Sequence, residues 1–301
     1  MKRLSIAIPA SVVSDTPHLR EKTSKIGLIG RAIAIFRVDE VVVYPDFPSS
    51  NQKKDMTLIT TLLAYMETPQ YLRKALFKLS PDLQYAGILP PLRTPHHPLN
   101  RRGTDLNAGE FREGVILSKE GGGCLIDIGI EQPVLVRNPE FPIGKRVTVK
   151  VVRVGKPAEV KIADQRETPE YWGYKVTLEK HPLGEIIKSR NCGLTLATSK
   201  YGKPLAQVAE RIGENWERSD DVLVAFGAPS LGLKEIVKRE GLLLDDLFDF
   251  VINTIPSQGT KTVRTEEAII ASLATFNVFF TAKASLPDSA ETVSRRAIDG
   301  A

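Results

Sequence analysis

Residues 222–229 read VLVAFGAP and residues 248–268 read FDFVINTIPSQGTKTVRTEEA. In both stretches an apolar run ends abruptly in small and polar residues, which is typical of a buried strand followed by an open loop. Residues 193–202, GLTLATSKYG, follow the same pattern. Helices are predicted over Leu205–Ile212 and from Glu266 onward. Because ligands of open α/β sheets bind beyond the carboxyl ends of the strands, we expect the three loops to form a binding site.

The beginning of the chain has the same α/β character. Leu4–Ile8 and Val41–Tyr44 are apolar runs that suit parallel strands covered on both faces. Between them, Lys22–Phe36 carries apolar residues at helical spacing. Two further helices are predicted, one over Met56–Met66 and one that begins near Thr68. Both ends of the chain therefore predict parts of one α/β domain.

The middle of the chain differs from both ends. GILPPLRTPHH, residues 87–97, contains three prolines and predicts a domain boundary. Five short runs of β character follow, and together they predict a small oligonucleotide-binding (OB) barrel. The runs are Phe111–Leu117, Cys124–Ile128, Val134–Val136, Val147–Val154 and Glu159–Ile162. We expect a discontinuous α/β domain over residues 1–92 and 167–280, an inserted barrel over 93–166 and a loose tail over 281–301.

Basic residues gather in the predicted barrel. Residues 93–166 hold 13 lysines and arginines against nine acidic residues, and so account for four of the five net positive charges. This charge favours contact with nucleic-acid phosphates. The alternative is that the basic residues only form a solvated surface and keep the strand edges from aggregating. Aromatic residues are scarce there, which speaks against base stacking. The candidates for phosphate contact are Arg101, Arg102, Arg112, Arg137, Lys145, Arg146, Lys150, Arg153 and Lys156.

Composition excludes several classes of protein. With 301 residues, 42% hydrophobic and 26% charged, the chain can bury a core without disulfides or structural metals. Cys124 and Cys192 form no CxxC pair, which speaks against a zinc ribbon or a secreted disulfide framework and favours the cytoplasm. No apolar run approaches the ~18 residues of a membrane helix. Pro9 interrupts the one stretch that imitates a signal peptide.

Common catalytic and metal-binding motifs are missing from the sequence. It contains no GxGxxG, no GxxxxGK[ST] and no GxSxG elbow. His96 and His97 are adjacent, and adjacent residues of an extended segment point to opposite faces, so we expect no metal there. Asp245, Asp246 and Asp249 are better explained by a solvated helix turn than by a metal site. We therefore expect no metal cofactor.

Three of these stretches together resemble the SPOUT, or knotted, RNA methyltransferases. They are FGAP at 226–229, NTIPSQGTKTVRTEEA at 253–268 and GILPPLRTPHH at 87–97. The chain is most similar to the archaeal and eukaryotic RNA uridine N3-methyltransferases with an inserted OB barrel, over about residues 1–280. The resemblance implies a parallel sheet with a C-terminal trefoil knot, S-adenosyl-L-methionine as methyl donor, and a homodimer in which each subunit completes the other's site.

The resemblance also implies roles for single residues. Gly227 would lie under the methyl donor, since glycine lets the backbone approach a ligand closely. Arg264 or Arg31 could be the catalytic cation that stabilises the uracil after it loses its N3 proton. Tyr201 departs from related sequences that can carry a basic residue there. The implied donor pocket consists of Thr198, Ser199, Gly227, Asn253, Thr254, Ile255, Thr260 and Val263.

We therefore expect an S-adenosylmethionine-dependent RNA methyltransferase that acts on uridine N3 in ribosomal or another structured RNA. Two alternatives stay open at this point. One is an RNA-binding scaffold of the same fold that catalyses no methyl transfer, and the other is a methyltransferase for the ribose 2′-hydroxyl. The presence of the implied donor-pocket residues favours catalysis. No general base is identified, because no histidine lies in the three loops.

Overall fold

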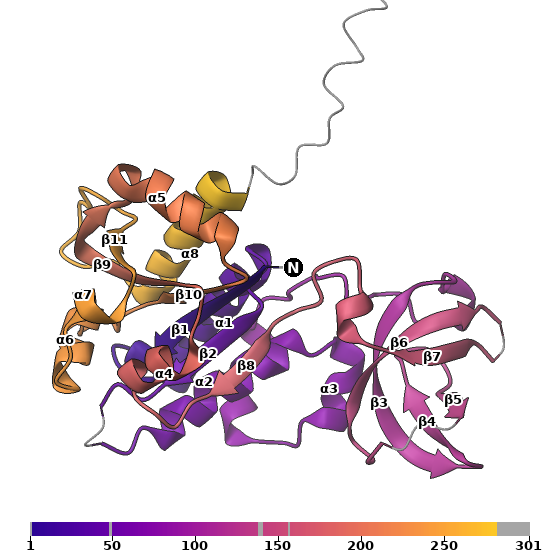
Figure 1. Ribbon diagram of the computed structural model, residues 1–301. Helices are drawn as coiled ribbons and strands as arrows, with labels where there is room; N and C mark the ends of the chain where they lie inside the picture. Colours follow the sequence, from indigo (N-terminus) through magenta and orange to yellow (C-terminus); the bar gives the residue numbers. More distant parts are fainter. Residues whose placement is uncertain (1, 48–49, 138–140, 156, 282–301) are drawn as a thin grey trace, which may run out of the picture.

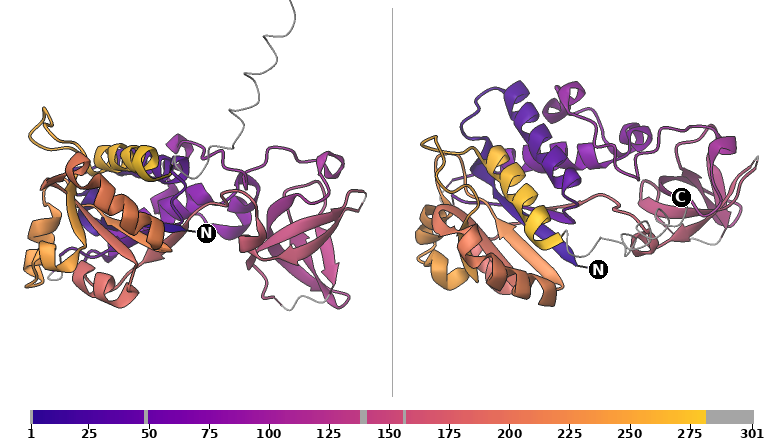
Figure 2. Two further views of the ribbon diagram at one scale, coloured as in Figure 1. Left: turned by 45° about the horizontal axis from the view of Figure 1, so that its top comes forward. Right: turned by 90° about the horizontal axis from the view of Figure 1, so that it is seen from above.

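The computed structural model describes residues 2–47, 50–137, 141–155 and 157–281, and it shows an α/β domain with a β-barrel at its side (Figure 1). The two ends of the chain form the α/β domain and the middle forms the barrel (Figure 1, Figure 2). The predicted combination of a parallel sheet with a five-stranded barrel is confirmed. Apart from the backbone of Thr281, the predicted tail lies outside the described residues.

A six-stranded parallel sheet forms the centre of the α/β domain, in the order β11-β9-β10-β1-β2-β8. The edge strand β8 was not predicted, because its residues are only partly buried and form no apolar run. The strands are β1 (Arg3–Pro9), β2 (Glu40–Tyr44), β8 (Lys175–Leu178), β9 (Leu194–Pro204), β10 (Asp221–Ala225) and β11 (Phe250–Asn253).

Helices cover both faces of this sheet. On one face pack α1 (Leu19–Ile35), α2 (Lys53–Glu67), α5 (Leu205–Arg218) and α8 (Thr265–Phe276). On the other pack α4 (Leu183–Arg190), α6 (Leu233–Arg239) and α7 (Leu244–Leu247). The strands alternate accordingly, since Ile6 and Ile8 contact the first layer and Ala7 the second. Two covered faces explain why the strands read as continuous apolar runs.

Shorter elements connect these layers. Helix α3 (Gln70–Leu76) follows α2 and packs against the barrel strand β3. Single helical turns occur at η1 (Ala10–Val13), η2 (Pro81–Leu83), η3 (Ala86–Ile88), η4 (Gly103–Asp105), η5 (Gln165–Glu167) and η6 (Asn277–Thr281). Helices α1 and α8 lie side by side, as Figure 2 shows. None of the helices in the described ranges combines the length and apolar character needed to cross a membrane.

The barrel consists of five antiparallel strands in the order β5-β4-β3-β6-β7. Its edge strands β5 and β7 lie against each other, so the sheet is nearly closed. Alternate residues such as Ile126 and Val149 fill its interior. All five predicted runs became strands: β3 (Phe111–Glu120), β4 (Gly123–Asp127), β5 (Val134–Arg137), β6 (Arg146–Arg153) and β7 (Glu159–Ala163).

A buried polar network fixes the barrel to the α/β domain. Arg146 of the barrel donates hydrogen bonds to the carboxylates of Glu67, at the end of α2, and Glu113. Glu113 also accepts a hydrogen bond from the indole nitrogen of Trp172. Burial alone would raise the pKa of Glu67, but the positive charge of Arg146 and a hydrogen bond from His96 lower that pKa to about 2. The junction therefore depends on an ionised Glu67.

The predicted arrangement of His96 and His97 is wrong. The segment turns rather than extends, because the His97 N–H donates to the carbonyl oxygen of Thr94 at 2.9 Å. The two imidazole rings consequently pack edge to face with centroids 4.3 Å apart. Both Nε2 atoms reach the carbonyl oxygen of Glu67, at 2.9 and 2.7 Å. Burial lowers the pKa of His97 to about 4, which keeps this ring neutral.

The aspartates near the end of the chain also serve the fold. Asp245 and Asp246 lie in α7, whereas Asp249 accepts hydrogen bonds from the backbone N–H and the hydroxyl of Thr195, both at 2.7 Å. Asp249 therefore ties the chain before β11 to the start of β9, and the solvated helix turn predicted for it is wrong. Within the part of the chain that the structure describes, no group of three or more His, Cys, Asp or Glu side chains could hold a metal ion.

Candidate functional site

A cavity of about 370 Å³ opens beside the middle of β9 and the carboxyl ends of β10 and β11. Pockets for small molecules usually span about 300–1,000 Å³, so its size suits a small ligand. The three expected loops line it, at residues 198–201, 226–233 and 253–265. Thr260 is not among the lining residues that the structure describes. The implied donor residues that do line it are Thr198, Ser199, Gly227, Asn253, Thr254, Ile255 and Val263.

The first loop is a bulge within β9, so the prediction that an open loop ends the strand within residues 193–202 is wrong. Ala197 pairs with Val251 of β11, and the next pair is Lys203 with Ile252. Five residues therefore leave the ladder between the two pairs, and the first four of them line the cavity. At Gly202, an added Cβ would lie 2.6 Å from the backbone of Ile252, so glycine is needed where the strand returns.

The second loop follows β10 and is a tight turn. Ala228 and Leu231 exchange backbone hydrogen bonds of 2.9 and 3.3 Å. A Cβ on Gly227 would lie 3.1 Å from the backbone nitrogen of Leu233 and 3.2 Å from the carbonyl oxygen of Leu231. A larger residue at this position would therefore force the neighbouring backbone to shift by a few tenths of an ångström, and this reason for glycine does not depend on the ligand contact that we expected.

The third loop is tied to the other two. Asn253 donates from its side-chain amide to the carbonyl oxygen of Lys200 at 3.0 Å, and its side-chain oxygen accepts from the N–H of Ile255 at 2.9 Å. Thr265, at the start of α8, donates from its hydroxyl to the carbonyl oxygen of Gly227 at 2.9 Å. These contacts fix the walls of the cavity before any ligand arrives.

The two arginines proposed for catalysis lie apart in one chain. Arg264 is exposed and stands between two lining residues, Val263 and Thr265. Its N–H donates to the carboxylate of Glu267 at 2.9 Å, and its guanidinium forms no salt bridge within the described ranges. Arg31 instead lines a second cavity. A single chain therefore brings only Arg264 to the mouth of the first cavity.

Sequence reasoning missed Glu235, which lies in the first turn of α6. It supplies the only carboxylate among the described residues that line the cavity. Its position one turn after a loop of the site was the available signal, because the first turn of such a helix faces the same edge of the sheet. Lys200 also lines the cavity, and its ammonium group donates to the carbonyl oxygen of Lys261 at 3.3 Å.

Two of the barrel residues proposed to contact phosphates serve the fold instead. The side chain of Arg112 is fully buried and donates to the Glu110 carboxylate at 2.8 Å and to Asn100. Arg146 belongs to the junction with Glu67. Both were proposed because sequence position alone does not distinguish the inside of a small barrel from its outside.

The other candidates are accessible to different degrees. Arg101, Arg102, Arg137 and Lys145 are exposed. Arg153 is exposed but paired with Glu159, and Lys150 lies over the Phe111 ring at 5.0 Å. Lys156 lies outside the described residues.

Fold and cavity together define an α/β protein with a small-molecule site at the carboxyl edge of a parallel sheet and a basic barrel at its side. The chain belongs to the family described as "Putative RNA methyltransferase", which matches residues 3–276. It is thus a member of an RNA methyltransferase family, as its motifs predicted.

Curated relatives cover nearly the whole chain. The chain is similar to the 28S rRNA (uridine-N(3))-methyltransferases of Mus musculus and Homo sapiens. The mouse protein is 35% identical, and the match covers 95% of this chain and 79% of the mouse protein. The human protein is 34% identical, and the match covers 90% of this chain and 77% of the human protein. An uncharacterised protein of Halobacterium salinarum is 34% identical over 89% of this chain and 96% of its own length.

Proposed function

We propose that this protein transfers a methyl group from S-adenosyl-L-methionine to N3 of a uridine in ribosomal RNA. The observation that carries the proposal is that seven donor-pocket residues implied by the family motifs meet around one cavity. The names of the mouse and human relatives support uridine N3 as the acceptor and ribosomal RNA as the substrate.

The lining of the cavity fits such a donor. Phe226, Leu233 and Ile255 offer apolar contact, while the loops present hydroxyl groups and backbone amides. The carboxylate of Glu235 can accept hydrogen bonds from ribose hydroxyl groups or from an amino group. When bound, S-adenosylmethionine supplies a methyl group on a positively charged sulfur. The role of this chain is then chiefly to hold donor and acceptor in line.

Of the two arginines proposed for catalysis, Arg264 is the one that lies beside the cavity and can act on the acceptor. It is exposed next to the cavity and has no salt-bridge partner within the described ranges, so its guanidinium can turn toward a bound base. A uracil that has lost its N3 proton carries negative charge on N3 and its carbonyl oxygens. A positioned cation stabilises that charge as it develops. We therefore assign Arg264 as a catalytic residue.

RNA contact is proposed for the exposed basic residues of the barrel. Arg101, Arg102, Arg137 and Lys145 can each neutralise a phosphate, and this would make RNA affinity fall with salt. On the family resemblance we also propose the trefoil knot, the homodimer and a cytoplasmic location. In such a dimer Arg31 would act at the site of the second copy, since it does not reach the cavity of its own chain.

The test is a transfer assay with purified protein, S-[methyl-³H]adenosylmethionine and unmodified large-subunit ribosomal RNA transcribed in vitro. We expect label in RNA that is recovered as 3-methyluridine after digestion to nucleosides. Label recovered as 2′-O-methyluridine would contradict the acceptor, and donor binding by calorimetry without any transfer would indicate a scaffold. The Glu235→Gln variant should bind the donor more weakly in the same calorimeter.

A further inference from the structure

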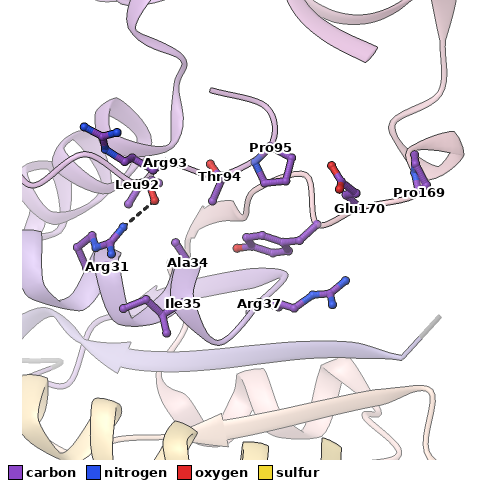
Figure 3. A pocket seen from close by; sticks show the side chains of 11 residues that line it. Arg31, Ala34, Ile35, Arg37, Leu92, Arg93, Thr94, Pro95, Pro169 and Glu170 are labelled. Atoms are coloured by element: carbon purple, nitrogen blue, oxygen red, sulfur yellow. Dashed lines mark hydrogen bonds between the residues drawn. The ribbon is translucent and has the colours of Figure 1, made fainter. Parts of the chain in front are cut away.

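A second, larger cavity lies where the two linkers of the barrel meet helix α1. Its volume is about 550 Å³, and it shares no described lining residue with the donor cavity. Its walls come from residues 31–37 at the end of α1, residues 92–95 of the linker into the barrel and residues 169–171 of the linker back (Figure 3). Because α1 leads into β2, this cavity lies toward the amino edge of the sheet, opposite the donor cavity.

Three arginines surround this cavity, against one carboxylate, that of Glu170. Arg31 and Arg93 lie together at one end and Arg37 at the other (Figure 3). None of the three forms a salt bridge within the described ranges. Arg31 donates to the carbonyl oxygens of residues 91 and 92, at 3.0 and 2.6 Å, and so positions the segment that carries Arg93.

Arg37 and Arg93 also have an unusual backbone conformation. Their φ angles are 55° and 53°, in the left-handed region where glycine is the least strained residue. Arg37 follows Phe36, the residue that caps α1, at a position where helices often carry glycine. A cation there also interacts favourably with the end of the helix, but Arg93 follows no helix. Because this conformation costs free energy, the presence of two such arginines around one cavity indicates that their side chains have a functional role there.

Thr94 places a buried polar group in one wall of this cavity. Its side chain lines the cavity, the residue is only 9% exposed, and its hydroxyl has no hydrogen-bond partner among the described residues. A buried hydroxyl without a partner costs free energy, and a ligand atom would recover it only after a local movement exposes this oxygen, which is buried in the structure.

The walls of the cavity are held in place by the buried junction. His96 follows one wall and binds the carbonyl oxygen of Glu67, while Trp172 follows the other and binds Glu113. Tyr171, which lines the cavity, donates from its hydroxyl to the carbonyl oxygen of Val38 at 2.7 Å. A ligand would therefore meet a preformed surface and would not have to order these segments.

We propose that this cavity binds the backbone of the RNA substrate, with Arg93 at one end and Arg37 at the other contacting successive phosphates. Cations at two ends, instead of around one point, suit a chain of phosphates better than a single small anion. Between them lie Ala34 and Ile35, and Ile35 is 55% exposed, which suits the apolar faces of a nucleotide. RNA leaving the barrel would cross this junction. The identity of the RNA rests on the proposed function.

The test uses the left-handed backbone conformation of Arg37 and Arg93, in which glycine is the least strained residue. Arg37→Gly and Arg93→Gly remove the cation but relieve strain, so both variants should fold at least as stably as the original protein. RNA binding is measured by fluorescence anisotropy with a fluorescein-labelled oligouridylate about ten nucleotides long, a length within the site sizes of such barrels. Arg218→Ala is the matched control, because Arg218 is exposed in the last turn of α5 and lines neither cavity.

Each glycine variant should lower RNA affinity about fivefold at about 0.1 M salt and reduce the salt slope by about 0.7, the value for one lost phosphate contact to a single strand. Affinity for S-adenosylmethionine and the thermal transition should not fall, and Arg218→Ala should match the original protein. Unchanged RNA affinity and salt slope in both glycine variants would overturn the proposal.

A second result would also overturn the proposal. If the glycine variants lost binding of uridine 5′-monophosphate but kept their affinity for the oligonucleotide, the cavity would be a site for a small anion. The binding assay needs no catalysis. A protein that binds RNA through Arg37 and Arg93 but transfers no methyl group would therefore contradict the proposed function and leave this inference standing.

Discussion

Replacing Glu67 with glutamine should loosen the attachment of the barrel at a cost that the structure allows us to calculate. The side chain keeps its shape but loses the charge that Arg146 and His96 face. The pKa of Glu67 is about 2 in the folded protein against an ordinary value of 4.5. At about 1.4 kcal/mol per pKa unit, this difference corresponds to about 3 kcal/mol of stability at neutral pH. Broken buried ion pairs typically cost a similar amount.

The pH dependence gives the sharper test. A carboxyl group whose pKa is lower in the folded state contributes its full stability above the unfolded pKa of 4.5, and the contribution disappears as the pH falls toward 2. At pH 3 the original protein should therefore exceed Glu67→Gln by only about 1 kcal/mol, compared with about 3 kcal/mol at pH 7. Urea unfolding followed by circular dichroism measures both differences.

The matched control is Glu210→Gln on the exposed face of α5. This variant should change the free energy of unfolding by less than about 0.5 kcal/mol at either pH. Two results would refute the reasoning: a loss below about 1 kcal/mol for Glu67→Gln at pH 7, or an equal loss at pH 3 and pH 7.

Three further substitutions test the site and the barrel. Arg264→Ala should bind the donor normally yet transfer methyl groups at least about tenfold more slowly in single-turnover assays. Arg264→Lys should restore little of this rate. A normal transfer rate in Arg264→Ala would show that Arg264 takes no part in catalysis. Replacing Arg101 and Arg137 with alanine should reduce the salt slope of RNA binding by about 0.7 for each residue, and an unchanged slope would show that they touch no phosphate. Gly202→Ala should cost about 1–3 kcal/mol in urea unfolding, because its Cβ meets the backbone of Ile252, and a silent variant would contradict that contact.

The strands were predictable wherever burial left a pattern in the sequence. The five barrel strands and the apolar runs of β1, β2 and β10 emerged from periodicity and turn residues alone. The edge strand β8 escaped because it is only partly buried. The bulge in β9 escaped because Lys203 and Pro204 look like loop residues, and only the pairing with β11 shows that the strand resumes.

The candidate site was predictable in its loops but not in its charges. The end of each apolar run located the three loops, and the family motifs supplied seven of the lining residues. Whether an arginine points to solvent or into the fold depends on tertiary contacts. Arg112 and Arg146 were therefore misassigned, while Arg37 and Arg93 gave no signal before their backbone angles and their shared cavity were known.

The most direct test of the central claim is nucleoside mass spectrometry of ribosomal RNA from host cells with and without this gene. The proposed function predicts one uridine that is 3-methylated in the presence of the gene, unmodified in its absence, and restored by the original protein but not by Arg264→Ala. An identical 3-methyluridine content in both ribosomal RNA preparations would contradict it.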